Sequence, residues 1–121
     1  MFRMPFSFAI FVLGFGAALA EEKPPHMDFS YRPSIAVTPG KTLTIKGVRG
    51  KSCGDPAPAW EDIVANLPVS TTGAFSDGGI GTVRSRACGK AVPARGVMFT
   101  ATTKGREKFT VFRDHVAITV F

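Results

Sequence analysis

Residues 97–121 of this 121-residue chain read VMFTATTKGREKFTVFRDHVAITVF. The quoted stretch holds three β-rich runs, residues 97–102, 108–112 and 116–121, separated by two short polar connections. Apolar and polar residues alternate along the first and third runs, as they do in strands that bury one face. Because the connections are short, we expect the three strands to pair as an antiparallel meander.

Two more runs with strand character lie upstream, at residues 34–38 and 41–48. The first run is followed by Pro39-Gly40, a pair of residues typical of turns. Apolar and polar residues alternate along the second run, which is the period of a half-buried strand. Lys46 falls among the polar positions of this run, so we expect its side chain on the face opposite the core.

Glycine divides the middle of the chain into shorter pieces. We predict strands over residues 69–75 and 80–85, joined by a turn at residues 76–79, which read SDGG. We expect a loop to begin at Cys88 and to run to Gly96.

Residues 55–68 have a helical pattern instead. Asp55 is suited to cap a helix that has Pro56 at its first position, and Pro68 lies just past the expected end. The apolar residues of this segment recur at helical spacing and form one stripe, made of Trp60, Ile63, Val64 and Leu67. A helix of about ten residues is held by packing more than by its own propensity, so we expect Trp60 in the core.

Together these elements predict a mainly β domain, an antiparallel β-sandwich or small barrel with one short helix and one disulfide. Residues 35–48, which read IAVTPGKTLTIKGV, and the terminal run 116–121 resemble the opening and closing strands of immunoglobulin-like modules of exported bacterial proteins. The resemblance implies an immunoglobulin-like sandwich and no particular activity. Cys53 and Cys88 depart from the antibody pattern, because they are too close in sequence to join its second and sixth strands.

The N-terminus has the features of a secretory signal peptide. Residues 1–20 begin with one cation, Arg3, continue with an apolar stretch and close on small residues at Ala18 and Ala20. We predict cleavage after Ala20, a flexible arm over residues 21–33 and a single domain over residues 34–121. The predicted mature chain has no second apolar run of membrane-spanning length. We therefore expect an exported protein, periplasmic or extracellular.

The two cysteines are the only ones in the chain, 35 positions apart. In an exported protein an even number of cysteines first indicates a disulfide. Metal ligation is the alternative, but neither Cys53 nor Cys88 has a CxxC partner or a nearby histidine. A bridge of this length stabilises the fold by roughly 4 kcal/mol in the chain-entropy model.

Positive charge is the most distinctive chemical feature. The whole chain has a net charge of +6, and a disulfide between the two cysteines would bring most of one group of cations towards one end of the molecule. The group consists of Lys46, Arg49, Lys51, Arg84, Arg86, Lys90 and Arg95. A clustered positive field attracts anions, such as an acidic glycan, lipopolysaccharide, a membrane surface or an acidic protein. Nucleic acid fits less well, because aromatic residues are not interleaved with the cations. The alternative is a solvated surface without a ligand.

Other chemistries have weaker support. His26 and Met27, with His115 and Met98 as distant partners, suit a copper or zinc ion, but one histidine near the N-terminus does not make a preformed site. Asp114-His115 has the composition of a catalytic pair, yet neighbouring residues in a turn point apart. We therefore expect no cofactor, no resident metal and no enzymatic activity. The sequence favours a non-catalytic binding or structural module of the cell envelope that contacts an anionic component or another protein, and a periplasmic copper-binding protein or a small secreted enzyme is the alternative.

Overall fold

A computed structural model describes residues 28–121. The predicted signal peptide, the first part of the predicted arm, and the candidate metal ligands His26 and Met27 lie outside the described residues. Within them, no helix is both long enough and apolar enough to cross a membrane.

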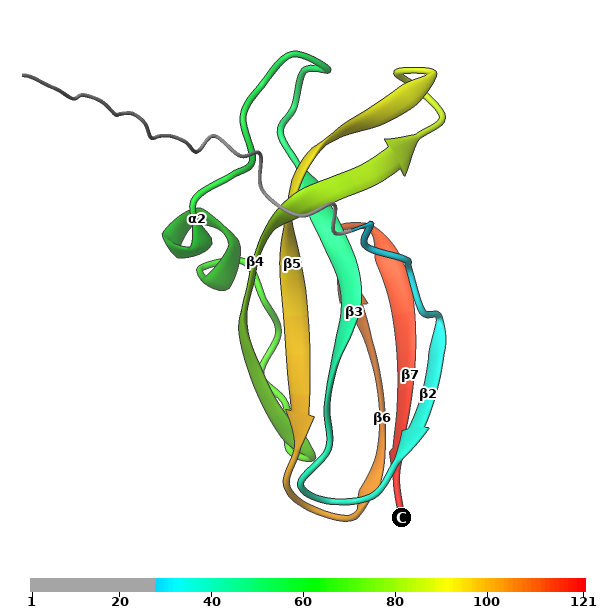
Figure 1. The fold of residues 1–121 in the computed structure, drawn as a ribbon. Coiled ribbons are helices and arrows are strands. Elements are labelled where there is room, and N and C mark those ends of the chain that lie inside the picture. Colours follow the sequence, from blue (N-terminus) through cyan, green and yellow to red (C-terminus); the bar gives the residue numbers. More distant parts are fainter. Residues whose placement is uncertain (1–27) are drawn as a thin grey trace, which may run out of the picture.

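The described chain forms two three-stranded sheets, one short helix and one disulfide (Figure 1). One sheet has the strand order β2-β7-β6 and the other β3-β5-β4. The mainly β fold predicted from the sequence is therefore confirmed. In chain order the elements are β2 (Ser34–Val37), β3 (Thr42–Arg49), α2 (Trp60–Val64), β4 (Gly73–Ser85), β5 (Lys90–Ala101), β6 (Gly105–Val111) and β7 (Asp114–Val120).

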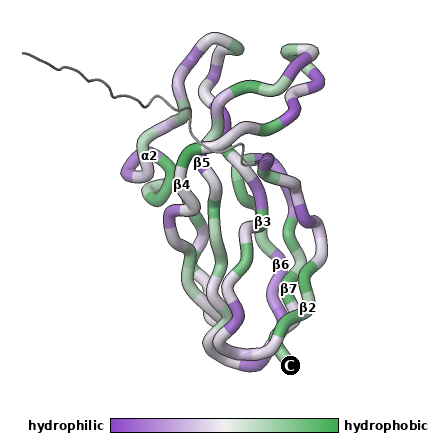
Figure 2. The backbone as a smooth tube through the Cα atoms, viewed as in Figure 1, coloured by the Kyte–Doolittle hydropathy of each residue, from purple (hydrophilic) through white to green (hydrophobic). Residues whose placement is uncertain are grey.

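The hydrophobic core draws on the strands of both sheets. Val97 and Phe99 of β5 are fully buried, and so, almost completely, are Val116 and Ile118 of β7. All four belong to one cluster of packed side chains, and Figure 2 shows apolar positions recurring along the strands. The alternation seen in residues 97–121 thus identified the residues that face the core.

The predicted meander is wrong in one respect. Strands β6 and β7 do pair antiparallel, but β5 pairs with β3 and β4 in the other sheet. The connection over residues 102–104 therefore passes from one sheet to the other. In addition, β2 pairs with β7 in parallel, so the sandwich is not purely antiparallel.

The predicted turn at residues 76–79 is a bulge within one long strand. Strand β4 continues from Gly73 to Ser85, and its register against β5 shifts between Asp77 and Ile80. Gly79 adopts a φ of 83° there, a conformation that glycine takes without strain. The chain reverses instead after Ser85, and β5 begins at Lys90, within the predicted loop.

The helix is shorter than predicted. It spans Trp60–Val64, and Ala59 stands at its N-cap without a side-chain hydrogen bond. Asp55 accepts a hydrogen bond from the backbone N–H of Ser52 instead, which ties it to the preceding loop. Ile63 of the predicted stripe is buried, and Trp60 packs partly buried against the core.

Residues 28–33 are attached to the fold. The backbone N–H of Phe29 donates to Thr82 of β4 at 2.8 Å, and that of Arg32 donates to Ile45 of β3 at 2.9 Å. Asp28 also forms a bridge with Thr82. The folded part of the chain thus includes residues that we expected in the flexible arm.

The predicted disulfide between Cys53 and Cys88 is confirmed, with a Cα–Cα distance of 5.7 Å. It joins the loop that follows β3 to the turn between β4 and β5. The two segments lie side by side at one end of the molecule, opposite the end that carries the C-terminus (Figure 1).

Candidate functional site

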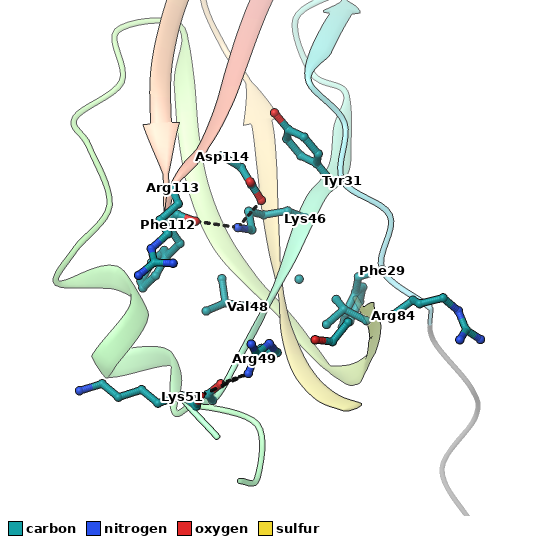
Figure 3. Close-up of a pocket in the computed structure, with 14 residues that line it drawn as sticks. Phe29, Tyr31, Lys46, Val48, Arg49, Lys51, Arg84, Phe112, Arg113 and Asp114 are labelled. Atoms are coloured by element: carbon teal, nitrogen blue, oxygen red, sulfur yellow. Dashed lines mark hydrogen bonds and ion pairs between the residues drawn. The ribbon is translucent and has the colours of Figure 1, made fainter. Parts of the chain in front are cut away.

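An open groove of about 640 Å³ lies between the β6–β7 turn, the second half of β3 and the end of β4. We call it the cationic groove. Its lining includes Lys46, Arg49, Lys51, Arg84 and Arg113, with Asp114 as the one carboxylate (Figure 3).

Lys46 forms the innermost polar contact of the cationic groove. A bulge between Thr44 and Lys46 interrupts the pairing of β3 with β5, so Lys46 turns inward and is buried next to Ile45. Its ammonium lies 2.7 Å from Oδ2 of Asp114 and also donates to the carbonyl of Phe112 at 3.1 Å and to that of Val111 at 3.3 Å. An ammonium has three donors, and these contacts use all of them. The expectation that Lys46 points away from the core is therefore wrong.

The turn above Lys46 has an unusual backbone. Phe112 and Arg113 have φ values of 45° and 74°, and both are non-glycine residues. A two-residue hairpin turn with both central residues at positive φ normally carries Asn or Gly. Such conformations cost of order 1–3 kcal/mol per residue and persist where the surrounding structure imposes them. Here the three hydrogen bonds of Lys46 hold the turn from below.

The loop after β3 forms the end of the cationic groove that lies opposite the β6–β7 turn. Arg49 donates from Nη1 to the carbonyl of Gly50 at 2.9 Å, which leaves its Nε and Nη2 donors without a hydrogen bond among residues 28–121. Lys51 is exposed. The loop is tied by the disulfide at Cys53 and by the hydrogen bond from Ser52 to Asp55 at 2.9 Å. Arg49 and Lys51 are thus presented from an anchored segment.

The cations differ in how they face the groove. Figure 3 shows the Arg84 side chain extending away from the groove centre, so its stem lines the wall while its charge lies at the rim. Arg113 projects from the turn on the opposite side. Lys46 and Asp114 form an ion pair, and this pair neutralises the one carboxylate. Four cations of the lining, Arg49, Lys51, Arg84 and Arg113, have no ion-pair partner among the described residues.

Aromatic and aliphatic side chains line the space between the cations. Val48 lies beside Phe112 on one side of β3, and Phe29 lies on the other side of that strand (Figure 3). Gly47 leaves room for Phe29 to pack on β3, because a Cβ at its position would lie 2.4 Å from Val83 and 2.9 Å from Phe29. The groove therefore combines positive charge with apolar surface.

The predicted cations divide into two sets. Lys46, Arg49, Lys51 and Arg84 line the groove, whereas Arg86, Lys90 and Arg95 do not. Arg86 lies in the β4–β5 turn and Lys90 is the first residue of β5. Arg95 is held elsewhere, since Nη1 lies 2.9 Å from both carboxylate oxygens of Asp77 and Nε donates to the carbonyl of Pro58 at 2.7 Å.

Sequence reasoning missed Arg113 and two aromatic side chains of the groove, Phe29 and Phe112. Nothing in the local sequence around Arg113 shows that the β6–β7 turn packs over β3. The sequence predicted a short connection at residues 113–115, and the structure has a two-residue turn one position earlier, at Phe112 and Arg113. The position of this turn relative to Lys46 depends on which sheets face each other.

Two carboxylates outside the groove have lowered pKa values. Partial burial of Glu107 would raise its pKa, but hydrogen bonds from the hydroxyls of Ser70 and Thr72 and from the N–H groups of Thr71 and Thr72 lower it to about 2. Desolvation would likewise raise the pKa of Asp77. Hydrogen bonds from the N–H of Gly79 and from Arg95, together with the charge of Arg95, nevertheless lower this pKa below its usual value. Glu107 thereby joins β6 of one sheet to the segment that leads into β4 of the other.

The candidate metal ligands that the structure describes are His115 and Met98. Nδ1 of His115 lies 3.2 Å from the hydroxyl of Thr110, and the Tyr31 hydroxyl donates to the His115 carbonyl. Met98 lies on β5, in the opposite sheet. Within residues 28–121 no group of three or more His, Cys, Asp or Glu side chains is placed to hold a metal ion.

Comparisons with protein families, with curated proteins and with solved structures gave no match for this chain. The resemblance to immunoglobulin-like modules therefore stays a prediction.

Proposed function

We propose that this chain is an exported, non-catalytic binding module that holds an anionic ligand in the cationic groove. The observation that carries the proposal is the charge of the lining. Arg49, Lys51, Arg84 and Arg113 have no ion-pair partner among the described residues, while the groove's own carboxylate, on Asp114, is paired with Lys46. An anion that enters the groove therefore meets uncompensated positive charge.

Preorganisation of the groove also supports binding. Lys46 holds the turn that carries Arg113, and the disulfide anchors the loop that carries Lys51. A site whose walls are already held in place loses less conformational entropy when a ligand binds. The cost of keeping Phe112 and Arg113 at positive φ is in accord with a turn retained for what it presents to the groove.

Ser85 is the one serine in the lining of the groove. Ser85 is buried and its Oγ accepts a hydrogen bond from the backbone N–H of Cys88 at 3.1 Å. Nucleophilic catalysis by serine needs an adjacent base such as histidine, and none of the side chains that line the groove is a histidine.

The disulfide supports the proposed export. Disulfides form and persist in oxidising compartments, which include the bacterial periplasm and the cell exterior. The predicted signal peptide over residues 1–20 agrees with that compartment. Mass spectrometry of the protein recovered from its host tests this part: we expect an N-terminus at Glu21, and an N-terminus at Met1 would contradict it.

Binding is tested with immobilised heparin as the anionic probe. The variant R49Q/R113N removes two groove cations, and K104Q/R106Q removes two exposed cations at the opposite end of the molecule. The two variants have the same net charge, so non-specific attraction falls equally in both. We expect the groove variant to bind about tenfold more weakly than wild type and the control to stay close to wild type. Equal losses in the two variants would contradict the proposal.

A further inference from the structure

The lining of the cationic groove is not cationic alone. Apolar side chains form part of the surface, among them Val48 and Phe112 on one side of β3 and Phe29 on the other, and none of these three carries a polar group that would bind an anion. A site built only for a small hydrated anion, such as free phosphate, has no use for such surface. Ligand sites of this size generally combine apolar walls with a few placed polar groups that orient the ligand.

The apolar and charged groups are arranged in order across the groove. Figure 3 shows Val48 next to Phe112 on one side of β3, with Arg49 beyond it towards the loop and Arg113 beside Phe112. The free donors of Arg49 therefore border a surface made of one ring and a branched aliphatic side chain. A ligand seated against Val48 has its edge next to a guanidinium, whose planar donors match the oxygens of a phosphate or carboxylate.

We infer that the groove binds an amphiphilic anion, that is, a phosphate or carboxylate group joined directly to a flat apolar body. The inference rests on the proposed function and specifies its ligand class. The acidic group pairs with Arg49 and Arg113, and the apolar body lies against the ring of Phe112 and the exposed edge of Val48, which is otherwise buried. Burying the apolar body adds affinity that does not depend on salt, whereas the charge contribution falls as salt rises.

The test compares inorganic phosphate, phenyl phosphate, 1-naphthyl phosphate and uncharged 1-naphthol by isothermal titration of the oxidised protein. We expect dissociation constants to fall by about tenfold from phosphate to phenyl phosphate and to fall again for naphthyl phosphate. We expect 1-naphthol to bind at least about tenfold more weakly than naphthyl phosphate. The ratio of phenyl phosphate to phosphate should stay constant between low and high salt.

Two variants test whether the apolar contribution to binding affinity comes from the groove. F112N removes one ring and keeps a residue type that tolerates positive φ, so the turn is retained. F121N removes a ring that is exposed at the opposite end of the molecule and serves as the matched control. F112N should abolish most of the gain from the phenyl group and leave the affinity for inorganic phosphate within about twofold, and F121N should change neither. A thermal melt of each variant confirms that it is folded.

Failure of this inference can be told apart from failure of the proposed function. If heparin and phosphate bind through Arg49 and Arg113 but the aryl phosphates bind no more tightly than phosphate, the ligand class is wrong and the anion site stands. If neither phosphate nor heparin depends on these arginines, both fall. A final experiment measures binding to phosphatidylcholine vesicles with and without phosphatidic acid. If the protein binds only the acidic vesicles, and aryl phosphates bind no more tightly than phosphate, the cations are assigned to a membrane surface instead.

Discussion

The Nζ atom of Lys46 lies 2.7 Å from Oδ2 of Asp114. The pair connects β3 of one sheet to the first residue of β7 in the other. Lys46 also donates to the carbonyls of Val111 and Phe112, so one buried side chain fixes the turn that carries Arg113. The charge of Lys46 is thus paired within the protein. Lys46 holds the lining of the cationic groove in place and does not bind a ligand itself.

Replacing Lys46 should therefore destabilise the protein more than replacing its partner. K46M leaves Asp114 unpaired and two carbonyls without their donor, for which we expect a loss of about 2–3 kcal/mol in the free energy of unfolding. D114N keeps the two carbonyl contacts and should cost about 1 kcal/mol. Urea denaturation measures both, and a K46M variant within 0.5 kcal/mol of wild type, roughly the range of ordinary surface changes, would contradict the assigned role.

Replacing Arg113 with asparagine should change stability and ligand binding in opposite directions. R113N places a residue that tolerates positive φ where arginine now has a φ of 74°, so we expect a gain of about 0.5–1 kcal/mol in unfolding free energy. The same change removes a groove cation and should weaken phosphate binding about threefold to tenfold. R113A is the matched control: it should weaken binding equally without the gain in stability. If R113N binds phosphate as wild type does, Arg113 is not part of the site.

The disulfide should supply a large part of the stability. The double variant C53S/C88S removes the cross-link without leaving a free thiol, and chain entropy predicts a loss of about 4 kcal/mol for 35 residues of separation. The effect is measured from the urea midpoints of wild type and of the variant, each with and without reductant. Reductant should lower only the wild-type midpoint. Unchanged wild-type stability after verified reduction would contradict the prediction.

Acid should destabilise the protein through Glu107. Its pKa lies at about 2 in the folded protein, against an ordinary value of 4.5, so the unfolded chain takes up the proton more readily. Stability from this group is complete above about pH 4.5 and is lost as the pH falls towards 2, for a total of about 1–2 kcal/mol after allowance for solvent screening. Asp77, whose pKa is also lowered, acts in the same direction.

The variant E107Q isolates this contribution. It should lower the urea midpoint at pH 6 and flatten its decline between pH 4.5 and pH 2.5. E61Q, at an exposed position in the helix, should retain the wild-type profile. Identical pH profiles for E107Q and wild type would show that the lowered pKa of Glu107 does not contribute to stability.

The fold was predictable where side chains alternate over several residues. Val97, Phe99, Val116 and Ile118 occupy apolar positions of the alternating runs, and all four are buried. The bond between Cys53 and Cys88 was predictable from their number and the expected compartment. Local pattern failed where one extra residue resets the alternation, as at the bulge beside Ile45 that turns Lys46 inward.

The groove was predictable only in part, because it joins segments distant in sequence. Arg49 and Arg84 were chosen for their charge and their nearness to the cysteines, and both line it. Arg95 was chosen on the same grounds, but Asp77 lies within 2.9 Å of it across the β4–β5 pairing. Arg113 enters the groove because the β6–β7 turn packs over β3, a contact between sheets that no local pattern contains.

Amide chemical shifts during a titration with phenyl phosphate test the site most directly, because they locate the ligand without any substitution. We expect saturable shifts concentrated in residues 46–51 and 112–114, with the amides of Lys104 and Arg106 unchanged. Shifts concentrated instead around Arg86 and Lys90 in the β4–β5 turn, or no saturable shifts at millimolar ligand, would contradict an anion site between β3 and the β6–β7 turn.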